Sequence, residues 1–158
     1  QVDPAAWHQA PEPGKWSPAA LVLHVCRSYE IGRDAMSGAP SMQLLVLPLQ
    51  AWLSRTVILP LLFATRRFPR GADAPAEVAP DPVEALRLTP SAAAQCLQRA
   101  AEGAVTALRR AARGPASPHF THAYFGPLHP YLTLRLLSAH TRHHTSALAR
   151  MVEHRRAG

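Results

Sequence analysis

The stretch "WSPAALVLHV", from Trp16 to Val25, combines a helix start with an apolar helix face that carries a histidine. Ser17 can cap a helix through its hydroxyl, and Pro18 suits the first helical turn, where a missing N–H costs nothing. A helix is therefore predicted from about residue 18 to residue 36, closed by Gly-Ala-Pro at 38–40. The positions at alternating steps of four and three residues define its core face: Ser17, Leu21, His24, Ser28, Ile31 and Ala35. His24 is thus expected to face the core.

The last predicted helix, from about Pro130 to Arg155, repeats this spacing and carries two more histidines on its core face. That face reads Thr133, Leu137, His140, His144, Ala147 and Met151. His140 and His144 are one helical turn apart and therefore neighbours. His143 falls toward the flank, in line with Arg150, and is expected to be more exposed. The other histidines are expected to be solvated, in loops or near the chain ends: His8, His119, His122, His129 and His154.

Three imidazoles on core-facing positions need a partner, because burying an unpartnered polar group costs about 1–3 kcal/mol. A divalent metal ion is one such partner, since an i, i+4 histidine pair can hold one ion and a third ligand can come from a facing helix. Three protein ligands leave a position open, as in catalytic zinc sites. The sequence therefore predicts a metal site at His24, His140 and His144. The alternative is a cluster of hydrogen-bonded core histidines without metal. No carboxylate is assigned a catalytic role, because Glu30 and Asp34 lie off the core face.

The most hydrophobic segment is "LLVLPLQAWLSRTVILPLLF", from Leu44 to Phe63. Its length approaches that of a membrane span, but Arg55 and three polar neighbours lie in its middle and Pro48 and Pro60 interrupt it. We therefore expect no membrane span and predict a kinked helix, buried in the fold or in a subunit contact. A protein anchored peripherally to a membrane by this segment stays open as an alternative.

The remaining chain adds one long helix and two irregular segments. Residues 66–82 are predicted to be a proline-rich connector without an element, and "ASPHFTHAYFGP", residues 116–127, to be a loop. A helix is predicted from Thr89-Pro90 to about Arg113. No strand alternation, glycine-rich phosphate loop or repeat is present in the sequence. These patterns predict one all-α domain over residues 1–158, an antiparallel helical bundle.

Composition narrows the function classes. The 158 residues are 47% hydrophobic and 17% charged, which is typical of a globular domain. The net charge of +7 comes almost entirely from scattered arginines, and only 6% of residues are aromatic, so no nucleic-acid partner is expected. Cys26 and Cys96 form no C-x-x-C pair, which argues against zinc-finger and thioredoxin sites and favours a reduced, cytoplasmic setting.

Two stretches resemble the DinB-like family, the damage-inducible family of four-helix proteins: "PGKWSPAALVLHV" at 13–25 and "HPYLTLRLLSAHTRHH" at 129–144. The short turn "HAYFGPL" before the last helix also fits the family, and the resemblance spans about residues 3–153. It implies an antiparallel four-helix bundle and a homodimer. It also implies a metal held by three histidines, which map to His24, His140 and His144. The family further has a helix before the Trp-Ser-Pro motif. Because "VDPAAWHQAPEPGKW" reads as the end of that helix, we expect the helix to be missing or truncated here.

The resemblance also implies a function. Similar proteins are thiol transferases that use low-molecular-weight thiols, or metal-dependent hydrolases. We therefore expect a metal-dependent enzyme, either a hydrolase or a thiol-S-transferase, acting on a small molecule. Its cofactor would be a divalent ion, with zinc expected first and nickel, iron or manganese as alternatives, and a low-molecular-weight thiol is an optional second cofactor. The alternative is a non-catalytic metal-binding bundle with an interaction or stress role. The long segment from Leu44 to Phe63 departs from ordinary members of the family.

Overall fold

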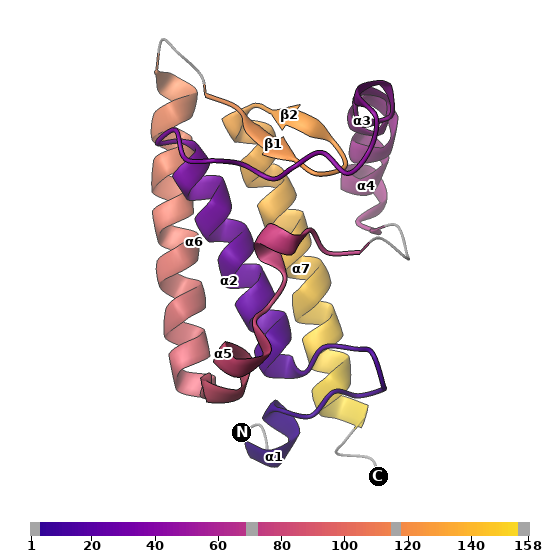
Figure 1. Cartoon of the computed structure of the whole chain (residues 1–158), viewed down its shortest axis with the longest axis vertical. Helices are drawn as coiled ribbons and strands as arrows, with labels where there is room; N and C mark the ends of the chain where they lie inside the picture. The colour runs from indigo at the N-terminus through magenta and orange to yellow at the C-terminus, as the bar shows by residue number, and fades with distance from the viewer. Residues whose placement is uncertain (1–3, 69–72, 115–117, 155–158) are drawn as a thin grey trace.

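Three long helices form the centre of the molecule in the computed structural model, which describes residues 4–68, 73–114 and 118–154 (Figure 1). They are α2 (Pro18–Ala35), α6 (Pro90–Arg113) and α7 (Pro130–His154), and each packs against the other two. All three were predicted from the sequence to within a few residues. The mostly helical architecture is therefore confirmed.

Helix α2 begins as its sequence predicts. The Ser17 side chain accepts a hydrogen bond from the backbone N–H of Ala20 at 3.2 Å, and Pro18 occupies the first turn. The predicted core face is buried at Leu21, His24 and Ser28. Helix α6 starts in the same way, with Thr89 accepting from the N–H of Ala92. Its buried residues are mainly alanines, which let α2 approach closely.

The segment after α2 forms a helical rod beside this core. The rod consists of α3 (Pro48–Leu53), a π-helical turn (Ser54–Ile58) and α4 (Leu59–Thr65), and we call it the α3–α4 rod. The π-helical turn ends two residues before Pro60, whose ring and missing N–H disturb the helical bonding of the preceding turn. The prediction of a helix here is confirmed. Of the two settings predicted for it, burial in the fold is wrong for most of its large side chains, which are exposed, and a subunit contact stays a prediction. Among the described residues, no helix is both long and apolar enough to cross a membrane.

A small β-hairpin corrects the all-α prediction. Strands β1 (Phe120–His122) and β2 (Gly126–Leu128) pair antiparallel, with Phe120 opposite Leu128, inside the segment predicted to be a loop. Phe120 and Leu128 are buried against α7 and the α3–α4 rod. Strands of three residues are too short to show an alternating pattern in the sequence.

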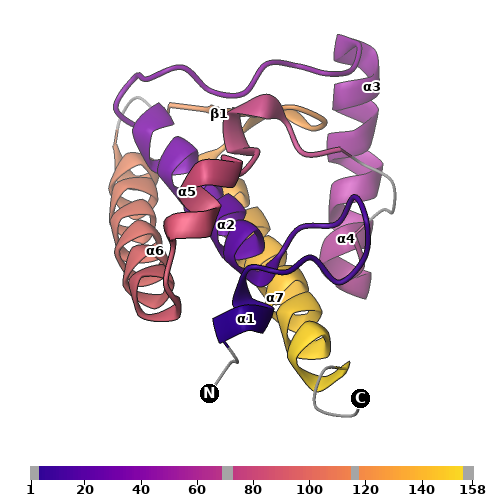
Figure 2. The same ribbon diagram turned by 60° about the horizontal axis from the view of Figure 1, so that its bottom comes forward.

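The proline-rich connector also contains elements that the sequence analysis missed. A 3-10 turn (Ala76–Val78, labelled η2) places Val78 in the core, where it is 1% exposed. Helix α5 (Pro82–Arg87) follows, capped by the Asp81 carboxylate, which accepts from the N–H of Glu84 at 2.9 Å. Both elements run along α2, as Figure 2 shows.

The N-terminal helix expected from the family resemblance is short. Helix α1 (Pro4–Trp7) has four residues, and the Trp7 indole N–H donates to the carbonyl of Leu88. The family resemblance implied a four-helix bundle with its first helix missing or truncated. The structure has three long helices, with the four-residue α1 before them and the α3–α4 rod beside α7 and the hairpin (Figure 1).

Candidate metal centre

The three predicted histidines lie together between α2 and α7. The Nε2 atom of His140 is 3.2 Å from that of His24 and 2.9 Å from that of His144. One ring nitrogen of each histidine lies within 4.8 Å of those of the other two. His24 is 5% exposed, and the other two are partly buried. The cluster is compatible with binding one metal ion, and no carboxylate or thiol from the described part of the chain joins it.

His24 is held in an orientation that is compatible with metal ligation. Its Nδ1 lies 2.8 Å from the carbonyl oxygen of Val78. Because a carbonyl oxygen can only accept, Nδ1 carries the hydrogen, and in the neutral ring Nε2 then presents a lone pair. That lone pair faces His140. Metal-binding histidines commonly donate their other N–H to a backbone carbonyl in this way.

Burial keeps the three rings neutral. It lowers the pKa of His24, an effect that the bond to Val78 partly offsets. Burial and then the neighbouring imidazoles hold the pKa of His140 well below its usual value, and the same causes lower the pKa of His144 to about 3. All three rings are therefore uncharged at neutral pH, which is the state that binds metal.

Aromatic rings that the sequence analysis did not assign to the site surround the cluster. The Trp16 ring lies 4.8 Å from that of His24, and the Phe68 ring lies 5.8 Å from that of His140. Near the cluster, the hydroxyls of Tyr29 and Thr141 form a 2.8 Å hydrogen bond that links α2 to α7. The only sequence signal for Trp16 was its place in the motif before Ser17.

A cavity of about 70 Å³ adjoins His24 and His140. Most of its lining is apolar, and the hydroxyls of Ser28 and Thr133 in its wall already donate to backbone carbonyls. His122 also lines it, so the prediction that His122 is solvated is wrong.

The hairpin fixes the tautomer of His122. Its Nδ1 accepts a hydrogen bond from the backbone N–H of Tyr124 at 3.2 Å, so the hydrogen of the neutral ring lies on Nε2. Burial lowers the pKa of His122 to about 4. Within the described part of the chain, no hydrogen-bond partner occupies this Nε2–H. His122 can therefore offer a donor to a molecule in the cavity.

The remaining histidines differ in their exposure to solvent. His143 is exposed on the flank of α7 and His119 is exposed before the hairpin, as predicted. His129 is only partly exposed, and its Nδ1 accepts from the backbone N–H of Tyr131. His8 is also partly buried, and its Nδ1 is buried without a partner among the described residues. The side chain of His154 lies outside the described ones.

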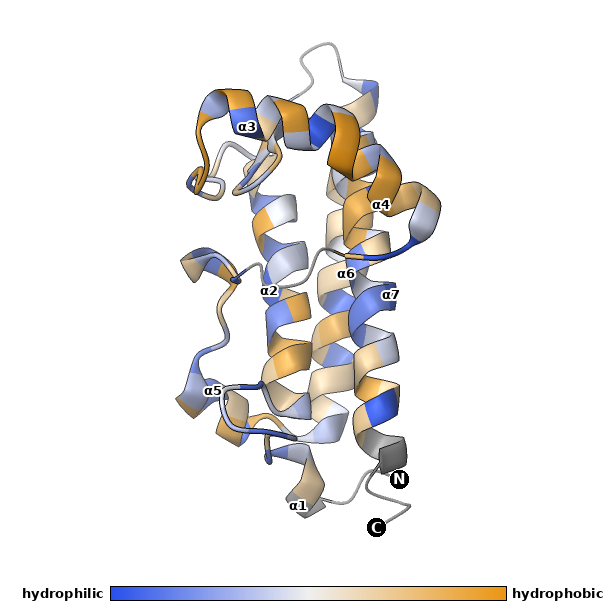
Figure 3. Cartoon of the chain, turned by 90° about the vertical axis from the view of Figure 1, so that its right-hand side faces the viewer, coloured by the Kyte–Doolittle hydropathy of each residue, from blue (hydrophilic) through white to orange (hydrophobic). Residues whose placement is uncertain are grey.

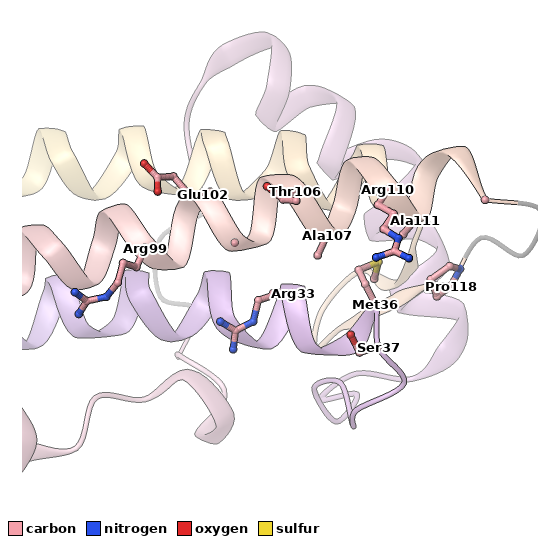
Figure 4. Close-up of a pocket in the computed structure, with 12 residues that line it drawn as sticks. Arg33, Met36, Ser37, Arg99, Glu102, Thr106, Ala107, Arg110, Ala111 and Pro118 are labelled. Atoms are coloured by element: carbon pink, nitrogen blue, oxygen red, sulfur yellow. The ribbon is translucent and has the colours of Figure 1, made fainter.

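A larger groove lies elsewhere on the molecule. It occupies about 1130 Å³ between α2 and α6 and contains Arg33, Arg99, Arg110 and Glu102 (Figure 4). Arg33 is already paired with Asp34 at 2.7 Å. This groove contains no histidine and offers one carboxylate among three cations, so it does not provide a set of metal ligands.

Comparison with known proteins agrees with the sequence motifs. The model of the DinB superfamily matches residues 1–148, which is most of the chain. No curated protein and no solved structure matches the chain.

Proposed function

Because the chain belongs to the DinB superfamily, we propose that it is a metal-dependent enzyme that acts on a small molecule at His24, His140 and His144. The observation that carries the proposal is the orientation of His24. Its Nδ1–H is bound to the Val78 carbonyl, and its Nε2 is directed at the Nε2 of His140. Histidines that bind a metal commonly have their nitrogens placed in this way, with one N–H on a carbonyl and the other nitrogen free to ligate.

The donor set suits a divalent transition metal. Neutral imidazoles favour zinc, nickel and iron, while manganese more often takes oxygen ligands. We therefore propose zinc first, with nickel, iron or manganese as alternatives. Three protein ligands leave coordination positions for other molecules, which is typical of catalytic rather than structural zinc sites.

A divalent ion supplies Lewis acidity, which in general activates water for hydrolysis or holds a thiol as its thiolate. The side chains of the protein contribute binding and orientation. The apolar wall of the cavity excludes water from a small substrate group, and the Nε2–H of His122 can donate to an acceptor atom on that group. His24 and the Val78 carbonyl together hold one side of the site rigid.

If the reaction is a thiol transfer, the thiol is a separate small molecule. Cys26 is buried, and burial and the neighbouring Cys96 raise the pKa of its thiol. It is therefore neither accessible nor ionised at neutral pH. We accordingly propose hydrolysis or the transfer of a low-molecular-weight thiol as the two reaction classes.

One observation favours the non-catalytic alternative. The Nε2 of His140 lies within hydrogen-bond distance of both neighbouring histidines, so the cluster can also satisfy its polar atoms through shared protons. In that case the protein would be a helical bundle with an interaction or stress role.

Elemental analysis of untagged protein, purified without nickel, separates the two functions. The enzyme proposal expects close to one divalent ion per chain and ester hydrolysis or thiol consumption that His24→Ala abolishes. Protein that stays metal-free after incubation with micromolar zinc would contradict the proposal and favour the hydrogen-bonded cluster.

A further inference from the structure

The α3–α4 rod and the segment leading into it expose an unusual number of large apolar side chains. Leu49 is 74% exposed, Leu47 68% and Trp52 52%, and Figure 3 shows the resulting apolar band on the rod. The complete set is Leu44, Leu45, Leu47, Leu49, Trp52, Leu53, Val57, Ile58 and Leu61. Contiguous apolar surface of this kind marks an interaction site in a folded protein.

This exposure is not the result of loose packing. On its other face the rod buries Ala51, Leu59 and Leu62. The guanidinium of Arg55 donates to the carbonyl of Pro127 at 2.9 Å, which fixes the rod against β2. The exposed face is therefore held outward by the fold.

A basic cleft lies at the C-terminal end of the rod. It occupies about 850 Å³, and its charged residues are Arg66 and Arg67 from the rod end and Arg142 and Arg150 from α7. No carboxylate lines it among the described residues, and the sequence contains no Asp or Glu between Asp34 and Asp73. Among the described residues, no acidic side chain pairs with the four guanidinium groups in this cleft.

We propose that the exposed face of the rod and the basic cleft form one docking surface for an anionic membrane. The apolar side chains, with Trp52 among them, would enter the boundary between headgroups and acyl chains, a position that tryptophan favours. The arginines of the cleft would bind lipid phosphates, because guanidinium groups match phosphate oxygens in charge and geometry. In this contact the protein lies on the membrane surface and does not span it. Membrane binding would be a property in addition to the proposed enzyme function.

The positive charge of this surface favours an anionic membrane over a second copy of the chain as its partner. A two-fold symmetric dimer would pair this surface with itself. Because no described residue that lines this surface is a carboxylate, a second copy would offer its arginines no counter-ions. Anionic lipid supplies both the apolar layer and the negative charge that attracts arginines near its surface.

Flotation of the full chain with lipid vesicles tests the proposal. Vesicles of phosphatidylcholine alone are compared with vesicles that contain phosphatidylglycerol, at low and high salt. We expect binding to the anionic vesicles, much weaker binding to the neutral ones, and loss of binding as salt rises. Leu49→Ser with Trp52→Ser should weaken binding about tenfold or more, and so should Arg66→Gln with Arg67→Gln.

The matched control is Arg109→Gln with Arg110→Gln on α6, which removes the same charge from exposed positions elsewhere. It should leave binding within about twofold. Circular dichroism checks that each variant folds, and no step of the test requires metal, which keeps it independent of the enzyme proposal.

Several results would overturn the docking surface. They are equal binding to both vesicle types, an equal loss in the α6 control, and binding of inorganic phosphate at the cleft without any vesicle binding. A dimer by light scattering that becomes monomeric in Leu49→Ser with Trp52→Ser, without vesicle binding, would show that a second copy covers the rod.

Discussion

The Nδ1 atom of His24 lies 2.8 Å from the carbonyl oxygen of Val78, which is 54 positions further along the chain. The next carbonyl, that of Ala79, accepts a hydrogen bond from Arg27, one turn along α2. Arg27 also pairs with Glu84 of α5 at 2.7 Å. The connector is thus bound to the same face of α2 that carries the candidate ligand, so the geometry of the metal centre depends on a segment outside the long helices.

Val78→Ala tests this dependence. The side chain is 1% exposed, and its truncation leaves a cavity beside the carbonyl that holds His24. We expect the free energy of unfolding to fall by about 1–3 kcal/mol and zinc affinity to fall about tenfold or more, as when an outer partner of a ligand is lost. Val83→Ala is the control, because Val83 is 57% exposed on α5 and should change neither quantity. Unchanged zinc affinity in a destabilised Val78→Ala protein would show that the geometry of the metal centre does not depend on the η2 turn.

His24→Ala and His144→Ala should each remove most bound metal, while His143→Ala should not. His143 is on the same helix and adjacent to His144, yet it is exposed and lies outside the cluster. Zinc at 100 times its dissociation constant should stabilise the wild type by about 2.7 kcal/mol, and this gain should vanish in the first two variants. Titration calorimetry and thermal unfolding measure both effects. Metal loss in His143→Ala with retention in His24→Ala would contradict the assignment.

The parts of the fold that the sequence predicted are those with long periodic signals. Caps at Ser17 and Thr89 located the starts of α2 and α6, and the repeated core spacing in α2 and α7 placed His24 and His140 at facing positions. The residues of the cluster follow directly from that periodicity.

The features that could not be predicted from the sequence are short elements and single local contacts. The hairpin has three residues in each strand, and α5 has six residues in a proline-rich context, so neither produces a period. His24 is held by the backbone carbonyl of Val78. Because every residue has such a carbonyl, the sequence does not indicate which one His24 contacts. His122 enters the cavity only because the hairpin turns it there, which no pattern in its own neighbourhood indicates.

His122 should make stability depend on pH. Its pKa is about 4 in the folded protein and near 6.5 in the unfolded chain. Between these values the unfolded chain binds the extra proton, so the free energy of unfolding should fall as the pH drops from 7 to 5. We expect His122 to contribute about 1–2 kcal/mol of that fall.

Urea unfolding of metal-free protein at pH 7 and pH 5 measures this contribution. His122→Gln should reduce the loss of stability, while the exposed His119→Gln should match the wild type. The histidines of the cluster change with pH in the same direction in all three proteins, so the difference between variants reports on His122. Identical pH dependence in all three would show that His122 is not buried as described.

The last prediction concerns the spacing between α2 and α7, which sets the distance between His24 and His140. A Cβ atom at Gly32 would lie 3.3 Å from the Cδ1 atom of the buried Leu137 on α7, whereas one at Gly103 would meet only the flexible side chain of Arg33 at 3.4 Å. Both glycines are inside helices, where alanine is favoured by roughly 1 kcal/mol. Gly103→Ala should therefore stabilise the protein by about 0.5–1 kcal/mol. Gly32→Ala should not give this gain, because the added methyl group would push α2 and α7 apart. It should also weaken zinc binding, whereas Gly103→Ala should leave zinc binding unchanged. Equal stabilisation by both substitutions, with equal zinc affinity, would show that α7 can shift without disturbing the metal centre.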